Sequence, residues 1–131
     1  MPAKVLIADD HASVRHSIRS LLEGDGGYQV CCEAKDGLEA VRLAKSCEHD
    51  VVIIDLLMPN LNGFQVAKQI SSSVPDVPIV LHTLYGGQAV EREAKKFGVD
   101  VVVPKVSSTN LKKVVENLLS SADCSRTAVP F

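Results

Sequence analysis

The sequence predicts an α/β fold in which a doubly wound sheet of five parallel strands carries helices on both faces. Two observations lead to this prediction. Short runs rich in Val and Ile alternate with segments of helical period along the whole chain. Three of these runs, residues 5–8, 51–54 and 79–81, are apolar at every position, which is typical of parallel strands covered by helices on both sides. Short connections between strands and helices favour right-handed crossovers, and hence one open sheet.

Five strands are predicted, and each is followed by a helix. They cover residues 4–8, 28–34, 50–54, 79–83 and 100–103. In a sheet of this kind, ligands bind outside the carboxyl ends of the strands, where the strand order reverses. We therefore expect functional residues directly after the strands.

Five helices are predicted from apolar spacing and from their end signals. Asp36 and Glu39 form a D-x-x-E pattern that opens the second helix, serines 71–73 end the third, and Gly98 closes the fourth. The serine and threonine side chains of residues 107–109 are candidate N-caps for the fifth. The apolar positions are Val14, Ile18, Leu21, Leu22, Leu38, Val41, Ala44, Phe64, Ala67, Ile70, Val90, Ala94, Phe97, Leu111, Val114, Val115, Leu118 and Leu119.

Length and composition narrow the class of protein. The 131 residues correspond to one domain, and the chain is long enough to bury a core without a disulfide or metal. Lys and Arg number 14 against 16 Asp and Glu, so the charge of −2 gives no support for a nucleic-acid surface. No apolar run is long enough to cross a bilayer, and no signal peptide opens the chain. We expect a cytoplasmic domain that does not contact membranes.

The cysteines carry no recognisable site. Cys31, Cys32, Cys47 and Cys124 show neither C-x-x-C spacing nor a histidine partner at zinc-finger spacing. We expect four reduced thiols, buried or incidental.

Charged and hydroxyl side chains follow four of the predicted strands. Asp9 and Asp10 follow the first, Asp55 the third and Lys105 the fifth, while Thr83 ends the fourth. If the first and third strands are neighbours, three carboxylates converge and repel one another unless a cation binds; Mg²⁺ suits such oxygen ligands and also favours a phosphoryl partner. Singly, each residue has a structural alternative, such as a helix cap, a loop-entry Asp or a solvated Lys. A joint site explains why all five fall at one edge of the sheet.

The same positions resemble a known family. Residues 5–11, 36–40, 50–59, 62–63 and 78–83 together are similar to the receiver domain of bacterial two-component response regulators. The likeness extends from residue 4 to about 119, and the Asp9-Asp10-His11 opening and residues 105–108 resemble receivers that precede LuxR-type helix-turn-helix domains. It implies a flavodoxin-like fold with strand order 2-1-3-4-5.

The resemblance also implies a chemistry. Asp55 would accept a phosphoryl group from a histidine kinase or phosphotransfer protein, Lys105 would contact the phosphoryl oxygens, and the Thr83 hydroxyl would hydrogen-bond to them and couple phosphorylation to a change of shape. Mg²⁺ would be held by Asp10 directly, by Asp9 mainly through water, by Asp55 and by the backbone carbonyl of Leu57.

Some positions depart from the family pattern. In many receivers a proline follows the lysine, whereas here Pro104 precedes Lys105. Val102 occupies the position where many receivers carry an aromatic switch residue, so we consider Tyr85 for that role. Leu57 and Tyr85 lie two residues beyond Asp55 and Thr83, where bulky side chains orient an attacking water poorly. We therefore expect slow self-dephosphorylation.

Three other functions are weighed against a receiver. A Mg²⁺-dependent aspartyl-phosphate hydrolase of the haloacid dehalogenase type needs D-x-D, but Leu57 occupies the second acidic position. In a flavin-binding flavodoxin, Asp9 and Asp10 would repel the phosphate. A receiver that signals without phosphate would not need the intact acidic, Thr83 and Lys105 set.

We expect a regulatory domain, not an enzyme, over residues 1–119, followed by a linker or tail over 120–131. Dimerisation through the last two helices is possible. Contact with DNA would require a helix-turn-helix domain that these residues do not contain, so the chain is either a stand-alone receiver or part of a transcription factor.

Overall fold

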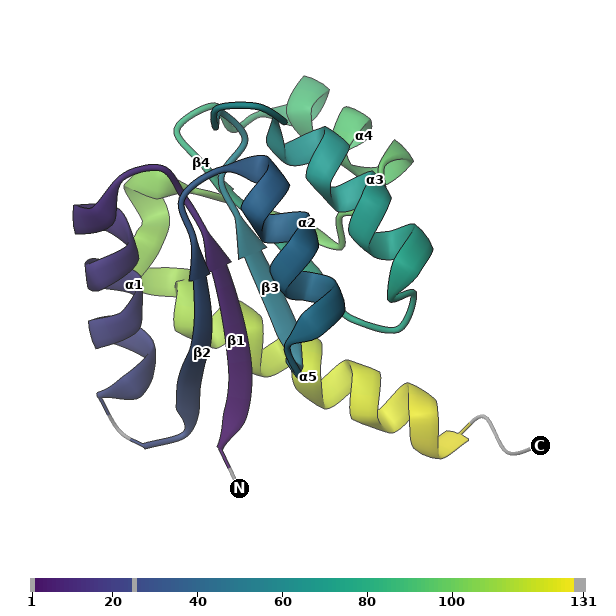
Figure 1. The fold of residues 1–131 in the computed structure, drawn as a ribbon. Coiled ribbons are helices and arrows are strands. Elements are labelled where there is room, and N and C mark those ends of the chain that lie inside the picture. Colours follow the sequence, from purple (N-terminus) through teal and green to yellow (C-terminus); the bar gives the residue numbers. More distant parts are fainter. Residues whose placement is uncertain (1, 25, 129–131) are drawn as a thin grey trace.

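Five parallel strands form one sheet in the order β2-β1-β3-β4-β5, as predicted (Figure 1). The computed structural model describes residues 2–24 and 26–128, and among these all side chains except those of 107–109 and 121–128. The strands are β1 (Ala3–Ala8), β2 (Tyr28–Ala34), β3 (Val51–Ile54), β4 (Ile79–Thr83) and β5 (Val101–Pro104). The helices are α1 (Ala12–Glu23), α2 (Gly37–Ser46), α3 (Gly63–Ser73), α4 (Gln88–Lys96) and α5 (Leu111–Ala128), with a 3-10 helix, η1 (Lys105–Asn110), before α5.

Helices cover both faces of the sheet (Figure 1). On β1, Val5 and Ile7 pack with α1 and α5, whereas Leu6 and Ala8 pack with α2, α3 and α4. This alternation follows from the two-residue period of a strand and explains why the central strands are apolar at every position. β3 is buried along its whole length.

Two predicted strands begin one residue later than expected. Asp50 and Asp100 lie just before β3 and β5, and each accepts a hydrogen bond from an amide at the start of the neighbouring strand. Asp50 Oδ2 accepts from the Lys4 amide at 2.8 Å, and Asp100 Oδ2 from the Ile79 amide at 2.7 Å. These carboxylates therefore lie at the amino-terminal ends of β3 and β5, at the edge of the sheet opposite the predicted site.

The helix starts agree with the end signals, and one capping motif had been missed. Asp36 Oδ1 accepts the Glu39 amide at 2.8 Å, as its D-x-x-E pattern predicts. Asn62 and Gln65 form a reciprocal capping box at the start of α3, with two hydrogen bonds of 2.9 Å. The proposed N-cap residues 107–109 fall within η1, and their side chains lie outside the description.

Helix α5 continues past residue 119 to Ala128 (Figure 1). The first residues of the segment 120–131 are therefore helical, and a boundary at 119 does not coincide with the end of a secondary-structure element. The division into a domain and a linker stays a prediction. Among the described residues, no helix is both long enough and apolar enough to cross a bilayer.

The expectation of reduced cysteines is wrong for one pair. Cys32 on β2 and Cys47, the residue that caps the carboxyl end of α2, are joined by a disulfide. The register between β1 and β2 shifts so that Val5 pairs with Val30 and Leu6 with Cys32, which leaves Cys31 as the extra residue. The packing of α2 against β2, and not a local spacing motif, brings the pair together. Cys31 is a free thiol, and the Cys124 side chain lies outside the description.

Candidate functional site

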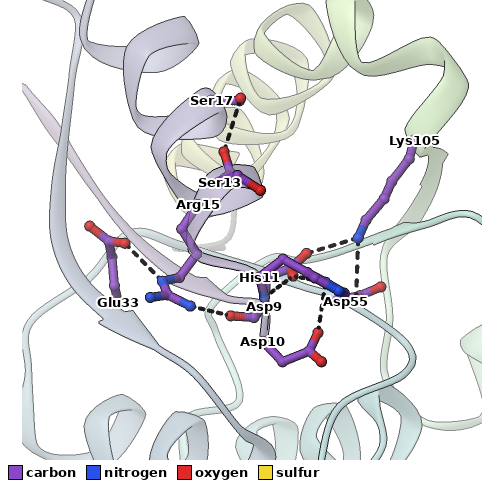
Figure 2. Close-up of polar contacts among 9 residues, drawn as sticks. All are labelled: Asp9, Asp10, His11, Ser13, Arg15, Ser17, Glu33, Asp55 and Lys105. Atoms are coloured by element: carbon purple, nitrogen blue, oxygen red, sulfur yellow. Dashed lines mark hydrogen bonds and ion pairs between the residues drawn. The ribbon is translucent and has the colours of Figure 1, made fainter.

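The predicted site residues gather at the carboxyl edge of the sheet. β1 and β3 are neighbours with Ala8 opposite Ile54, so the residues that follow them, Asp9 and Asp55, emerge side by side. Figure 2 shows these two carboxylates with Asp10 and with the Lys105 side chain, which reaches in from the segment after β5. The convergence of three carboxylates and one ammonium that the sequence predicts is thus present.

Lys105 bridges the two buried carboxylates. Its Nζ lies 2.9 Å from Asp9 Oδ2 and 3.3 Å from Asp55 Oδ2. Burial alone would lower the pKa of Lys105, but the hydrogen bond to Asp9 and the charges of Asp55 and Asp9 raise it above its usual value. The Lys105 ammonium is therefore a fixed positive charge beside Asp55.

The pKa of Asp55 is raised as well, which for a carboxyl group favours the neutral form. Its burial, followed by the nearby charge of Asp9, raises its pKa above the ordinary value, while Lys105 offsets part of this effect. The Asp55 backbone is held in place because its amide donates to the Ala8 carbonyl at 2.8 Å, and its carboxylate pairs with Lys105. A buried carboxylate stabilised by a neighbouring cation is suited to act as a nucleophile.

Gly63 allows the loop after Asp55 to fold back on itself. The Gly63 amide donates to the Leu56 carbonyl at 2.7 Å. A Cβ atom at this position would lie 2.6 Å from the Asp55 carbonyl oxygen and 2.8 Å from Leu56 Cα. The start of α3 can pack this closely against the end of β3 only with a glycine.

The acidic group fits a divalent cation. Asp9, Asp10 and Asp55, together with His11, each offer one ligand atom, and these atoms all lie within 4.8 Å of one another. Carboxylate oxygens at this density are the donors that Mg²⁺ prefers, and a cation would relieve their repulsion. The further ligand expected from the Leu57 carbonyl stays a prediction.

Hydrogen bonds and ion pairs support the loop that carries Asp9 and Asp10 (Figure 2). Arg15 Nη1 on α1 donates to the Asp9 carbonyl oxygen at 2.7 Å, and Arg15 Nε donates to Glu33 Oε1 on β2 at 3.0 Å. Arg19 also pairs with Glu33. Although burial alone would raise the pKa of Glu33, the hydrogen bonds from Arg19 and Arg15 lower it, so Glu33 stays ionised.

Thr83 is fully buried at the end of β4, and its hydroxyl has a local partner. Thr83 Oγ1 accepts a hydrogen bond from the Tyr85 amide at 3.1 Å. The side chains of the next two residues, Leu84 and Tyr85, are exposed. The hydroxyl is therefore tied to the β4–α4 loop.

Sequence reasoning missed His11, Arg15 and Glu33 as parts of this site. His11 follows directly after Asp9 and Asp10, and this adjacency was a usable signal. Arg15 and Glu33 carry no such signal, because only the packing of α1 beside β2 brings them together.

Comparisons with known proteins agree with this geometry. A family comparison matches residues 5–116 to the response regulator receiver domain. The transcriptional regulatory protein YdfI of Bacillus subtilis is 39% identical over 95 residues, which cover 72% of this chain and 44% of that protein. The response regulator protein VraR of Staphylococcus saprophyticus is 33% identical over 110 residues, covering 84% of this chain and 53% of that protein.

A solved structure of a response regulator has a similar fold. A LuxR-family two-component response regulator from Aurantimonas sp. superposes with a TM-score of 0.87 at 31% identity, covering 92% of this chain and 87% of the other. The chain spans about half or less of the length of the curated relatives it matches. The family match covers residues 5–116, and the acidic group lies at the carboxyl edge of the sheet. This chain therefore belongs to the response regulator receiver domains.

Proposed function

We propose that this receiver is a signalling switch that accepts a phosphoryl group on Asp55 from the phosphohistidine of a histidine kinase or phosphotransfer protein. The observation that supports the proposal most strongly is the position of Lys105, whose ammonium lies between Asp9 and Asp55 at 2.9 and 3.3 Å. An ionised Asp55 oxygen would attack phosphorus, forming the P–O bond as the P–N bond to the donor histidine breaks. Lys105 then pairs with the negative charge on the phosphoryl oxygens.

Asp9, Asp10 and Asp55 would hold Mg²⁺ in this proposal. When bound, the ion supplies charge neutralisation for the phosphoryl group and the carboxylates. Lys105 lowers the cost of ionising Asp55, and Arg15 keeps the Asp9 backbone in place. These residues orient the acidic group before any phosphodonor arrives.

Thr83 would convert phosphorylation into a change of shape. Its oxygen accepts the Tyr85 amide, so a movement of the hydroxyl toward a phosphoryl oxygen would pull on the loop that bears Leu84 and Tyr85. A single new hydrogen bond can bias a loop with two arrangements in this way. Tyr85 thus stands in for the aromatic residue that Val102 does not supply.

Exposed apolar side chains support a protein as the phosphodonor. Leu57, Leu84, Tyr85 and Val106 lie in the segments that follow β3, β4 and β5, and between 53% and 88% of each is exposed. Large apolar side chains exposed beside a reactive group are typical of a protein-docking surface.

The same proposal includes three further features of the protein. The receiver would act in the cytoplasm and could form a homodimer, and it would contact DNA only through a separate helix-turn-helix domain.

Mass spectrometry after incubation with Mg²⁺ and acetyl phosphate tests the proposal. We expect a mass gain of one phosphoryl group that is absent in Asp55→Ala and retained in Asp76→Ala, the same change at an exposed aspartate. Turnover of added phosphate esters without a stable mass gain would contradict it and favour the hydrolase of the haloacid dehalogenase type. That alternative is disfavoured because Leu57 stands in place of its second acid.

A further inference from the structure

The His11 imidazole lies among the carboxylates of the proposed cation site (Figure 2). His11 Nδ1 is 3.4 Å from Asp9 Oδ1 and 3.1 Å from Asp10 Oδ1. No role is assigned to this nitrogen by the phosphoacceptor chemistry above. The inference that follows concerns the same site, and so rests on the proposed function.

These separations match those between neighbouring ligands of one metal ion. At metal–ligand distances of about 2.1 Å, two adjacent ligands of an octahedral ion lie about 3 Å apart, and two opposite ligands about 4.2 Å apart. The nitrogen has two carboxylate oxygens near the first spacing, and the whole group lies within 4.8 Å. The imidazole and the carboxylates can therefore share one cation with small adjustments.

The backbone holds His11 in this position. Its amide donates to Asp9 Oδ1 at 2.9 Å, and its carbonyl accepts from the amides of Val14 and Arg15, each at 3.1 Å, at the start of α1. The side chain is 64% exposed and caps no helix amide, and its Nδ1 lies against the Asp9 and Asp10 carboxylates, so the ring can bind a cation held there without breaking a helix cap. Because the backbone is fixed, rotation about the two side-chain torsions of His11 is the only adjustment that its ring needs to reach the cation site.

Imidazole nitrogen changes which ions such a site prefers. Mg²⁺ takes oxygen ligands, whereas first-row transition ions accept imidazole as well as carboxylate. We propose that His11 supplies a nitrogen ligand to the divalent-cation site and shifts its preference from Mg²⁺ toward Mn²⁺. The receiver would then respond to the supply of a transition metal as well as to its phosphodonor.

Pulsed electron paramagnetic resonance on the full chain tests the ligand directly. With ¹⁵N-labelled histidine and bound Mn²⁺, we expect a ¹⁵N coupling to the ion that is lost in His11→Phe. The matched control His16→Phe, at an exposed histidine on α1, should retain it. Mn²⁺ bound to the wild type without ¹⁵N coupling would overturn the inference.

Calorimetric titration at one fixed pH gives a second readout. His11→Phe should weaken Mn²⁺ binding by about tenfold or more, because even supporting residues of metal sites have effects of that size, and should change Mg²⁺ affinity much less. If His11 is instead a positive charge that competes with the metal, its removal would tighten both ions equally, and the inference would be wrong.

The acetyl phosphate assay, carried out with Mg²⁺ on the same samples, separates the two proposals. Phosphorylation of Asp55 in wild type and His11→Phe, combined with absent nitrogen coupling, overturns the role of His11 alone. Failure of both metal binding and phosphorylation in the wild type would overturn the proposed function together with this inference.

Discussion

The Arg15 guanidinium on α1 donates a 2.7 Å hydrogen bond to the backbone carbonyl of Asp9, in the loop that precedes its own helix. The same guanidinium pairs with Glu33 on β2 at 3.0 Å. Arg15 thereby joins the acidic loop to a strand and a helix at once. The position of Asp9, and through Lys105 that of Asp55, depends on a residue that contacts the backbone of Asp9 and not its carboxylate.

Replacing Arg15 should therefore impair both stability and phosphorylation. In Arg15→Leu, we expect the free energy of unfolding to fall by about 1–3 kcal/mol, because Glu33 and the Asp9 carbonyl lose a charged donor. Phosphorylation of Asp55 by acetyl phosphate should slow as the loop loosens. Urea denaturation and time-resolved mass spectrometry measure the two effects.

Arg42→Leu is the matched control. Arg42 is 72% exposed and pairs with Glu39 at 3.4 Å, so its loss should change stability by less than about 0.5 kcal/mol. Equal phosphorylation rates in the two variants would contradict the supporting role of Arg15.

Gly63→Ala should destabilise the protein at the loop after β3. The new Cβ would meet the Asp55 carbonyl oxygen at 2.6 Å and Leu81 Cδ1 at 2.9 Å, so backbone and core must shift. Overpacking of this kind costs about 1–3 kcal/mol, measurable by urea denaturation. Gly24→Ala, where the nearest atom is 3.2 Å away and φ is −58°, should cost less; an equal loss would refute the steric argument.

The lifetime of phosphorylated Asp55 should depend on Leu57. Its side chain is 53% exposed two residues beyond Asp55, and an apolar group there cannot orient an attacking water. Leu57→Asn should dephosphorylate faster than the wild type, as followed by mass spectrometry after the phosphodonor is removed. Leu38→Asn, at an equally exposed leucine on α2, should leave the lifetime unchanged. A wild-type lifetime equal to or shorter than that of Leu57→Asn would disprove the prediction.

His82 should make the protein less stable in mild acid. Its burial in β4, with a smaller contribution from the Lys105 charge, lowers its pKa to about 4 from an ordinary value of 6.5. Because the unfolded chain then binds a proton that the folded chain excludes, this contribution to stability is present above pH 6.5 and is lost as the pH falls toward 4. The full loss is about 3 kcal/mol.

Comparison of the wild type with His82→Asn isolates this contribution. The raised pKa of Asp55 acts in the opposite direction, but it is common to both proteins and cancels in the difference. We expect the difference in the free energy of unfolding to change between pH 6.5 and pH 5 in urea titrations. A difference independent of pH would show that His82 is not kept neutral by the fold.

Much of the fold and of the acidic site could be predicted because both follow from local patterns. Short runs that are apolar at every position and helices with a 3.6-residue period determine the layers, and parallel strands bring their carboxyl ends to one edge. Asp9, Asp55 and Lys105 needed only this placement, and they meet as expected.

Contacts between elements far apart in the sequence were decided by the tertiary structure alone. Glu33 meets Arg15 because α1 packs beside β2, and Cys32 meets Cys47 because α2 packs on a shifted register. No residue pattern encodes these pairings, since each depends on the relative position of two packed elements. The sequence by itself determined which groups reach the edge of the sheet; tertiary packing decided which partner each group takes there.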